Sequence, residues 1–342
     1  MNYRGNSFER DSEGRIIVDS FYDKVKKKLE TRGKREKFWL IFDDEKVLFK
    51  KINDMTFEDY AEMLAEELYK QVGLPAATYD LAVYNGEKGV LTENFLGEDE
   101  TLISGNVFIT ENLQFLGMGK LGGVGQREVI LNNVKTIEAI LKSTLTPEQS
   151  KKEIKKLYAM FGMYCMTLQG DIHWRNWSVL YNPKSEQRYK LSPLYDSAGM
   201  CRFSRGKNKL YGIYSGFVRI GDDERARKYV EESMFSEKNF DRDSIMKYAP
   251  NSPAYMGVTK LMDAFRQNPK SFIKVLKGLL LLDPEKAVQD VEKRIGTSMP
   301  DLAKNWFVAI INRNKRFLST ELSNYYSQVS NIEENNTHKR TH

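Results

Sequence analysis

The stretch from Gly170 to Gly199 constrains the fold more than any other part of the sequence. Residues 177–181 and 189–195 each have the apolar, partly aromatic composition of a buried strand, and a polar Asn-Pro turn separates them. This pattern predicts a β-hairpin. In an antiparallel hairpin, the residue before the first strand and the residue after the second return to the same open end.

Oxygen-bearing side chains gather at that open end. Asn176 precedes the first strand, Asp196 follows the second, and four residues separate Asp171 from Asn176. Carboxylate and amide oxygens suit Mg²⁺ better than zinc or copper. The same spacing occurs in the protein-kinase catalytic loop, where the Asp orients the attacking hydroxyl and the Asn holds metal. Such a loop could instead be turn chemistry only, but Trp174 and Trp177 tie it to a core.

Composition describes an ordinary globular protein that can bury a large core in two lobes, since 41% of the 342 residues are apolar and 29% are charged. The net charge of +6 is the difference between 53 basic and 47 acidic residues spread along the chain. Nucleic-acid binding is therefore permitted but not indicated. The two cysteines, Cys165 and Cys201, form no CxxC pair, which disfavours a disulfide framework and a cysteine-rich zinc site.

No segment has the length and apolar character of a transmembrane helix. The longest apolar run, 275–282, contains Lys277, and the N-terminus lacks the apolar core of a signal peptide. We therefore expect a protein in the cytoplasm of the producing cell, and we also expect a monomer. Secretion or translocation into a host cell by a route without a signal peptide stays open.

Residues 1–95 are predicted to form the first lobe, a small antiparallel sheet with one main helix. Phe21, Val25 and Leu29 fit one face of a short helix near its start. The main helix is expected over 56–73, where Thr56 could cap it and Gly73 could end it. Strands are expected at 38–42, 46–52, 78–83 and 89–95, the last two joined by an Asn-Gly turn.

Lys50 lies on the strand 46–52, where alternation places it on the same face as Leu48. It could point inward to a ligand, or it could be an edge-strand lysine that prevents aggregation. Glu58 or Glu62 on the following helix could reach back to it, although a solvated helix face explains these glutamates equally well. Gly33, among basic residues before a strand, could let backbone amides approach a phosphate or could belong to a basic surface loop.

Residues 96–330 are predicted to form the second, mostly helical lobe. The segment Gly117–Gly125 lacks the order of a phosphate-binding P-loop and is interpreted as a flexible connection or lid. A capping box at Thr146 begins a long helix that should end at Gly170, so that the catalytic loop follows the helix directly. Further helices are expected at 226–235, 259–265, 272–282, 284–295 and 300–322, followed by a polar, disordered tail over 331–342.

These features resemble the HipA-type serine/threonine kinases over roughly residues 30–310. The motifs that carry the resemblance are Leu-Phe-Lys at 48–50, Val-Gly-Leu-Pro at 72–75, Gly-Asp-Ile-His-Trp-Arg-Asn-Trp at 170–177 and Leu-Ser-Pro-Leu-Tyr-Asp-Ser at 191–197. The resemblance implies an α+β, bilobal protein-kinase-like fold and ATP- and Mg²⁺-dependent phosphorylation of a protein Ser or Thr. Within this family the whole chain is most similar to a cell-translocating, pro-inflammatory bacterial kinase, which implies an exported effector as an alternative setting.

The resemblance also implies roles for particular residues. Lys50 would contact the nucleotide phosphates with Glu62 as its helix partner, preferred to Glu58 because of its spacing from the glycine at 73. Asp171 would act as base and His173 could steady a terminal phosphate. Two sets complete the expected site: nucleotide contacts at Gly33 and Glu93, and metal ligands at Asn176 and Asp196.

Departures from the family pattern keep other functions open. His173 replaces the usual Lys of protein kinases, and the loop is also similar to the Asp-Arg-His-x-x-Asn loop of phosphatidylinositol kinases, so a lipid kinase is the main rival. A kinase-fold module that binds an acidic partner without turnover is a third interpretation. No family-type extra N-terminal subdomain is evident, and pairing with a DNA-binding antitoxin is not expected. Autophosphorylation is expected at Ser197, Ser204 or Ser215, which follow Asp196; the basic stretch 202–209 contains Ser204.

Overall fold

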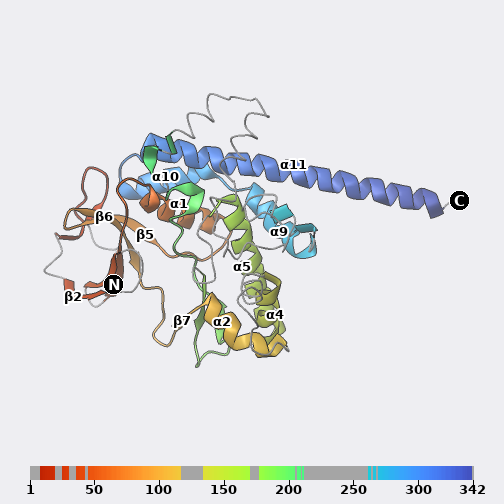
Figure 1. Ribbon diagram of the computed structural model, residues 1–342, viewed down its shortest axis with the longest axis horizontal. Coiled ribbons are helices and arrows are strands. Elements are labelled where there is room, and N and C mark those ends of the chain that lie inside the picture. The colour runs from red at the N-terminus through yellow and green to blue at the C-terminus, as the bar shows by residue number, and fades with distance from the viewer. Residues whose placement is uncertain are drawn as a thin grey trace.

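The computed structural model separates into a sheet-rich N-terminal part and a helix-rich remainder, along which the C-terminal helix α11 (Asp301–Arg340) runs (Figure 1). This arrangement confirms the predicted fold class, a small antiparallel-sheet lobe followed by a mostly helical lobe. The structure describes residues 8–19, 25–30, 36–42, 45–116, 134–169, 177–204, 206–208, 210–211, 261–262, 265–266 and 269–340.

In the described part of the chain, six strands form the N-terminal sheet in the order β1-β5-β6-β4-β3-β2. Among these described strands, β1 and β5 are the one pair that runs parallel. Asn85 and Gly86 join β5 to β6 with φ angles of 51° and 75°, as an Asn-Gly hairpin turn requires. The strands are β1 (Ile16–Ile17), β2 (Val25–Glu30), β3 (Lys37–Phe42), β4 (Glu45–Lys51), β5 (Tyr79–Tyr84) and β6 (Glu87–Glu93).

The segment Val25–Glu30 is a strand, so the short helix predicted from Phe21, Val25 and Leu29 is wrong at residues 25–30. β2 pairs antiparallel with β3, with a register shift between Val25 and Lys28. Short helices are marginal in water, so local apolar spacing alone stabilises such a segment poorly. Pairing at the sheet edge supplies backbone hydrogen bonds from residues that are distant in sequence.

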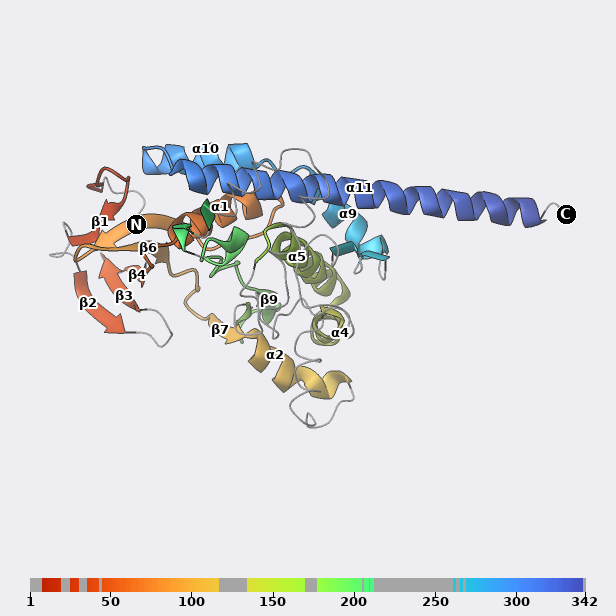
Figure 2. The same cartoon turned by 45° about the horizontal axis from the view of Figure 1, so that its top comes forward.

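Strand β4 places Lys50 toward the main helix α1 (Glu58–Gln71). Val47 and Phe49 are buried in a small apolar cluster on the opposite face of the sheet. Lys50 lies beside Val90 of β6, which is buried in the large core shared with α1. Because β4 lies between β6 and β3, the interpretation of Lys50 as an edge-strand lysine is wrong (Figure 2).

Helix α1 lies within the predicted range 56–73 but begins differently. The residue at its N-cap is Phe57, which provides no side-chain hydrogen bond. Thr56, predicted as the cap, donates its hydroxyl to the carbonyl oxygen of Asn53 at 2.7 Å. The chain leaves the helix through Gly73, whose φ of 70° is a common conformation at a helix C-terminus.

The rest of the described chain contains a second, three-stranded sheet and most of the helices. Strand β7 and helix α2 lie within residues 96–133, where no regular pattern predicts an element. The sheet consists of β7 (Thr101–Ser104), β8 (Ser178–Tyr181) and β9 (Tyr189–Leu191). The remaining helical elements are α2 (Gly105–Asn112), η3 (Leu113–Leu116), α4 (Val134–Thr144), α5 (Pro147–Met166), η4 (Met200–Arg202), α9 (Pro269–Leu280) and α10 (Pro284–Ile295).

The hairpin predicted around residue 185 is present, because β8 and β9 pair antiparallel. The second strand is shorter than the predicted 189–195. After β9 the chain crosses to the first lobe, where Leu194 accepts a backbone hydrogen bond from Ala77 at 2.8 Å and donates one to Pro75 at 2.9 Å. These bonds fix the backbone immediately before Asp196.

Helix α5 begins with the predicted capping box, in which Thr146 and Gln149 exchange side-chain to backbone hydrogen bonds of 3.3 Å. It ends at Met166 and not at Gly170. Leu168 has a φ of 50°, which takes the backbone out of the helical conformation before Gly170.

Helix α11 continues to Arg340, so the structure corrects the prediction of a disordered segment over residues 331–340. The sequence contains no Gly or Pro after Pro300, and a helix can therefore continue through polar residues without meeting a strong breaker. In the described ranges, no helix is both long enough and apolar enough to cross a membrane.

Candidate functional site

The ammonium group of Lys50 contacts two carboxylates. Its Nζ lies 2.7 Å from Oε1 of Glu62 on α1 and 2.5 Å from Oδ1 of Asp196, which follows β9. The Glu62 side chain is 1% exposed, whereas the Asp196 side chain is 41% exposed. This cluster is therefore buried at its glutamate and open to solvent at its aspartate.

Helix α1 also holds the segment that follows Asp196. The second carboxylate oxygen of Glu62 accepts a hydrogen bond of 2.6 Å from the backbone N–H of Ser197. The Ser197 hydroxyl lies 3.0 Å from the hydroxyl of Tyr69, and both groups are buried. A displacement of α1 would therefore move Asp196 as well as Glu62.

The backbone of Asp196 adopts a left-handed conformation with a φ of 58°. This conformation costs energy in a residue other than glycine, and it persists where neighbouring groups fix it. The Asp196 N–H donates to the Tyr79 hydroxyl at 3.3 Å, and its carbonyl oxygen accepts from Nε2 of Gln169 at 3.2 Å. Tyr79 and Gln169 thus hold the aspartate from the two lobes.

Burial alone would lower the pKa of Lys50, but the charges of Glu62 and Asp196 outweigh it and raise the pKa well above its ordinary value. Lys50 is therefore cationic at neutral pH. A fixed cation beside an exposed carboxylate can contact a polyphosphate while the carboxylate contacts a metal ion.

Comparison with known proteins identifies the family of the chain. The family described as the HipA-like C-terminal domain matches residues 29–270, more than half of the chain. The chain belongs to the HipA-like family. No curated protein matches the sequence of this HipA-like protein.

Several solved structures are similar in fold to this HipA-like protein, and two of them are described here. The Helicobacter pylori proinflammatory kinase CtkA has a TM-score of 0.59 at 16% identity, over 86% of this chain and 93% of that one. The Shewanella oneidensis MR-1 toxin–antitoxin protein HipA, solved with HipB and operator DNA, has a TM-score of 0.50 at 14% identity, over 86% of this chain and 67% of that one. The predicted likeness to HipA-type kinases, and to CtkA in particular, is confirmed at the level of the fold.

A second ion-pair cluster fixes α1 of this HipA-like protein against α10. Glu66 has a fully buried side chain, and its Oε2 lies 2.7 Å from Nη1 of Arg294 while its Oε1 lies 2.7 Å from Nζ of Lys70. The backbone N–H of Tyr79 also donates to Glu66, at 3.0 Å. Burial alone would raise the pKa of Glu66, but the charge of Arg294 and the hydrogen bonds from Lys70 and Arg294 outweigh it and lower the pKa.

Arg294→Met is expected to lower the free energy of unfolding by about 3 kcal/mol, because Glu66 would keep a buried charge without its main partner. The folded-state pKa of Glu66 is depressed, so its stabilising contribution is present above the unfolded pKa and is lost as pH falls through the folded pKa. The deficit of the variant should therefore be largest at neutral pH and should shrink on acidification. Urea unfolding at several pH values measures it.

Arg266→Met is the matched control, because Arg266 is 46% exposed and pairs with Glu321, which is 31% exposed. Such a surface pair contributes at most about 1 kcal/mol. Equal losses in the two variants, or a loss that is independent of pH, would contradict the assignment of Arg294 as the residue that keeps Glu66 ionised.

The structure describes two further residues considered for the site, Glu58 and Glu93, but not the remaining ones. Oε2 of Glu58, the alternative to Glu62, lies 3.3 Å from the Thr56 hydroxyl, whose shorter contact is with the Asn53 carbonyl oxygen. Glu93 ends β6 and is half-buried opposite Val47. The following lie outside the described residues, and their placement stays a prediction: Gly33, Gly117–Gly125, Asp171, His173 and Asn176.

Sequence reasoning missed three residues that position the site, Tyr69, Tyr79 and Gln169. Gln169 could have been noticed from its place two residues before Asp171. The two tyrosines carry no such signal, because an aromatic residue on a helix or strand normally predicts core packing alone.

Proposed function

We propose that this HipA-like protein is an ATP- and Mg²⁺-dependent protein kinase that phosphorylates a serine or threonine hydroxyl. The observation that supports the proposal most is Lys50, held by buried Glu62 and in contact with half-exposed Asp196. Protein kinases use such a strand lysine on the nucleotide phosphates, a helix glutamate to hold it and a following aspartate on Mg²⁺. A purely structural ion pair would have no need of the solvent-exposed second carboxylate.

The available side chains fit Mg²⁺. Asp196 offers a hard carboxylate donor that solvent reaches, and Asn176 is its proposed partner. No group of three or more His, Cys, Asp or Glu side chains forms a metal site elsewhere among the residues that the structure describes. Bound Mg²⁺ would neutralise phosphate charge.

The proposal assigns the remaining roles residue by residue. Lys50 would contact the nucleotide phosphates, and Glu93 and Gly33 would contact the nucleotide. Asp171 would orient the acceptor hydroxyl and take its proton, with His173 near the transferred phosphate.

The proposal is tested by incubating the protein with labelled ATP and Mg²⁺, with and without EDTA, and measuring its intact mass. A protein substrate such as casein and phosphoinositide vesicles are offered in parallel. We expect metal-dependent label in protein. Label that enters only lipid would favour the lipid-kinase alternative, and the absence of label in any acceptor would favour a binding module without turnover.

Autophosphorylation is expected at Ser204. Of the three candidate serines, Ser197 is 2% exposed and hydrogen-bonded to Tyr69, whereas Ser204 is exposed; Ser215 lies outside the described residues. A phosphate on Ser204 would lie near the basic residues of 202–209 and gain charge-assisted hydrogen bonds.

Phosphopeptide mapping checks this prediction. Ser204→Ala should remove one phosphate from the intact mass, and Ser319→Ala, which changes an exposed serine on α11, should not. Phosphate found only outside residues 197–215 would remove this segment from the regulatory argument.

A further inference from the structure

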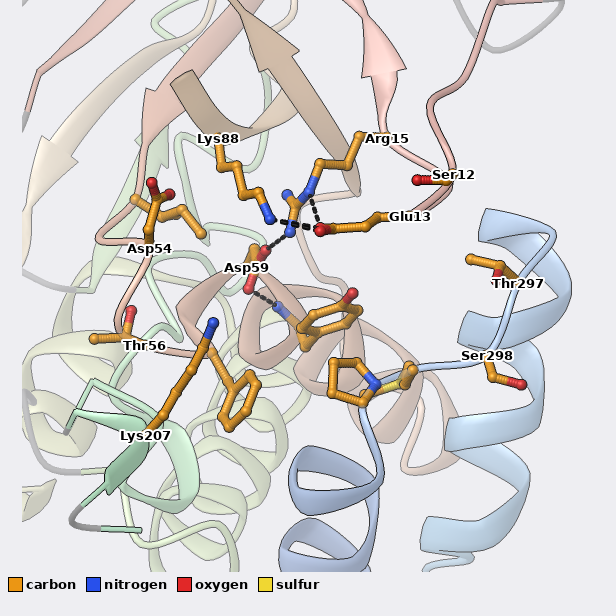
Figure 3. A pocket seen from close by; sticks show the side chains of 15 residues that line it. Ser12, Glu13, Arg15, Asp54, Thr56, Asp59, Lys88, Lys207, Thr297 and Ser298 are labelled. Carbon is orange, nitrogen blue, oxygen red and sulfur yellow. Dashed lines mark hydrogen bonds and ion pairs between the residues drawn. The ribbon is translucent and has the colours of Figure 1, made fainter. Parts of the chain in front are cut away.

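A pocket lies apart from the Lys50 cluster, where the N-terminal segment, the start of α1 and the loop between α10 and α11 meet (Figure 3). It encloses about 250 Å³. Figure 3 shows Arg15, Lys88 and Lys207 extending their nitrogen-bearing ends toward its middle from three different segments. The hydroxyl-bearing residues that line it are Ser12, Thr56, Tyr60, Thr297 and Ser298.

Arg15 is a buried cation with an unused donor. It is 2% exposed, its Nη2 lies 2.5 Å from Oδ2 of Asp59 and its Nε lies 2.9 Å from Oε2 of Glu13. Its Nη1 is also buried and has no hydrogen-bond partner in the described structure. A buried N–H group without an acceptor is costly, so this atom marks a place where an acceptor from a ligand would be stabilising.

The acidic residues of the pocket are mostly engaged already. Glu13 lies 2.6 Å from Nζ of Lys88, in addition to its contact with Arg15. Asp59 contacts Arg15 through Oδ2 and accepts the backbone N–H of Tyr60 through Oδ1 at 2.9 Å. These carboxylates therefore have few free acceptor sites for a metal ion.

Lys207 supplies a cation that no carboxylate neutralises among the described residues. Its Nζ lies over the ring of Phe57, 5.0 Å from the ring centroid. Asp54 is the one lining carboxylate without an ion pair in the described part of the chain, and it is exposed at the rim. Inside the pocket, Nη1 of Arg15 and Nζ of Lys207 are therefore hydrogen-bond donors without a carboxylate partner among the described residues. Such donors favour an anion with several acceptor oxygens.

We propose that this pocket binds a phosphate group, as the free ion or as a small phosphate monoester, between Arg15 and Lys207. Phosphate oxygens accept charge-assisted hydrogen bonds from guanidinium and ammonium groups, and the hydroxyls of the pocket can complete the shell. The volume accommodates a phosphate with a small substituent. This proposal does not depend on the proposed kinase activity.

Such a ligand would link elements that position α1. Lys207 belongs to the segment that follows η4. This segment already contacts the N-cap of α1, because the backbone N–H of Phe57 donates a hydrogen bond of 3.2 Å to the carbonyl oxygen of Phe203. Asp59, which holds Arg15, precedes Glu62 by less than one helical turn. Phosphate in the pocket would therefore brace the first turn of α1 against the segment that follows η4.

Titration calorimetry of the intact protein with inorganic phosphate, and separately with O-phosphoserine, tests the proposal at constant ionic strength without nucleotide. Lys207→Met should weaken the tighter-binding of the two ligands by about tenfold, because one charge-assisted contact is lost. Lys277→Met is the matched control, an exposed lysine on α9, and should leave the affinity unchanged. Tighter binding of inorganic phosphate would indicate that the pocket takes the free ion, and tighter binding of O-phosphoserine would indicate a phosphate monoester.

The thermal midpoint gives a second readout, since a ligand that binds only the folded state raises it with concentration. The rise with phosphate should be smaller in Lys207→Met than in Lys277→Met. Two results would each overturn the proposal: no saturable binding of either ligand at millimolar concentration, or equal affinities in the parent and in Lys207→Met. Neither result bears on the kinase assay, which measures transfer of label from ATP and not binding of phosphate in this pocket.

Discussion

Replacing Asp171 by asparagine is expected to lower kcat by roughly 10²-fold or more while leaving nucleotide affinity within a few-fold of the parent. Phosphoryl transfer needs in-line placement of the acceptor hydroxyl, and the proposed role of Asp171 is to orient that hydroxyl and take its proton. The amide can still accept a hydrogen bond but cannot serve as the base. Steady-state kinetics with the preferred acceptor measure kcat, and calorimetry with a non-hydrolysable ATP analogue measures affinity.

The matched control is Asp99→Asn, which removes the same charge from an exposed carboxylate that pairs with Lys184. Its kcat should equal that of the parent. A parental kcat in Asp171→Asn would show that the active site has been placed wrongly. A fall in kcat accompanied by an equal loss of nucleotide affinity would instead assign Asp171 to nucleotide binding.

The sequence was sufficient to predict the hairpin of β8 and β9 and the main helix because each depends on a local signal, whereas it left open whether Lys50 points inward or lies on an edge strand. Alternation places Lys50 on one face of its strand, and Glu62 follows on the next helix, so a single strand-to-helix connection brings the two together. Asn85 and Gly86 supply a turn conformation that few other residue pairs adopt.

Other features depend on partners that are distant in the chain. Arg294 and Glu66 form an ion pair although they are far apart in the sequence. No sequence pattern around either residue predicts this pairing. The strand assignment of Val25–Glu30 depends on β3 alongside it. In Arg15, Glu13 binds Nε and Asp59 binds Nη2, so Nη1 is left without an acceptor. Only the folded structure determines which of these nitrogens is paired.

Lys50→Met is expected to lower the free energy of unfolding by about 3 kcal/mol or more, because Glu62 would stay buried without its cation. The pKa of Lys50 is raised, so its contribution is fully present below the unfolded pKa and is lost only as pH rises through the folded value. The full deficit should therefore appear at neutral pH. The variant should also lose nucleotide affinity, since Lys50 is the proposed contact for the phosphates.

A double-mutant cycle separates the buried charge from simple loss of packing. Lys50→Met combined with Glu62→Gln should be more stable than Lys50→Met alone, because the neutral amide needs no buried cation. Lys51→Met is the control on the same strand: Lys51 pairs with exposed Glu87 and its loss should leave stability near that of the parent. If Glu62→Gln fails to rescue Lys50→Met in urea unfolding, the lysine acts through packing, and the charge coupling that links β4, α1 and Asp196 is wrong.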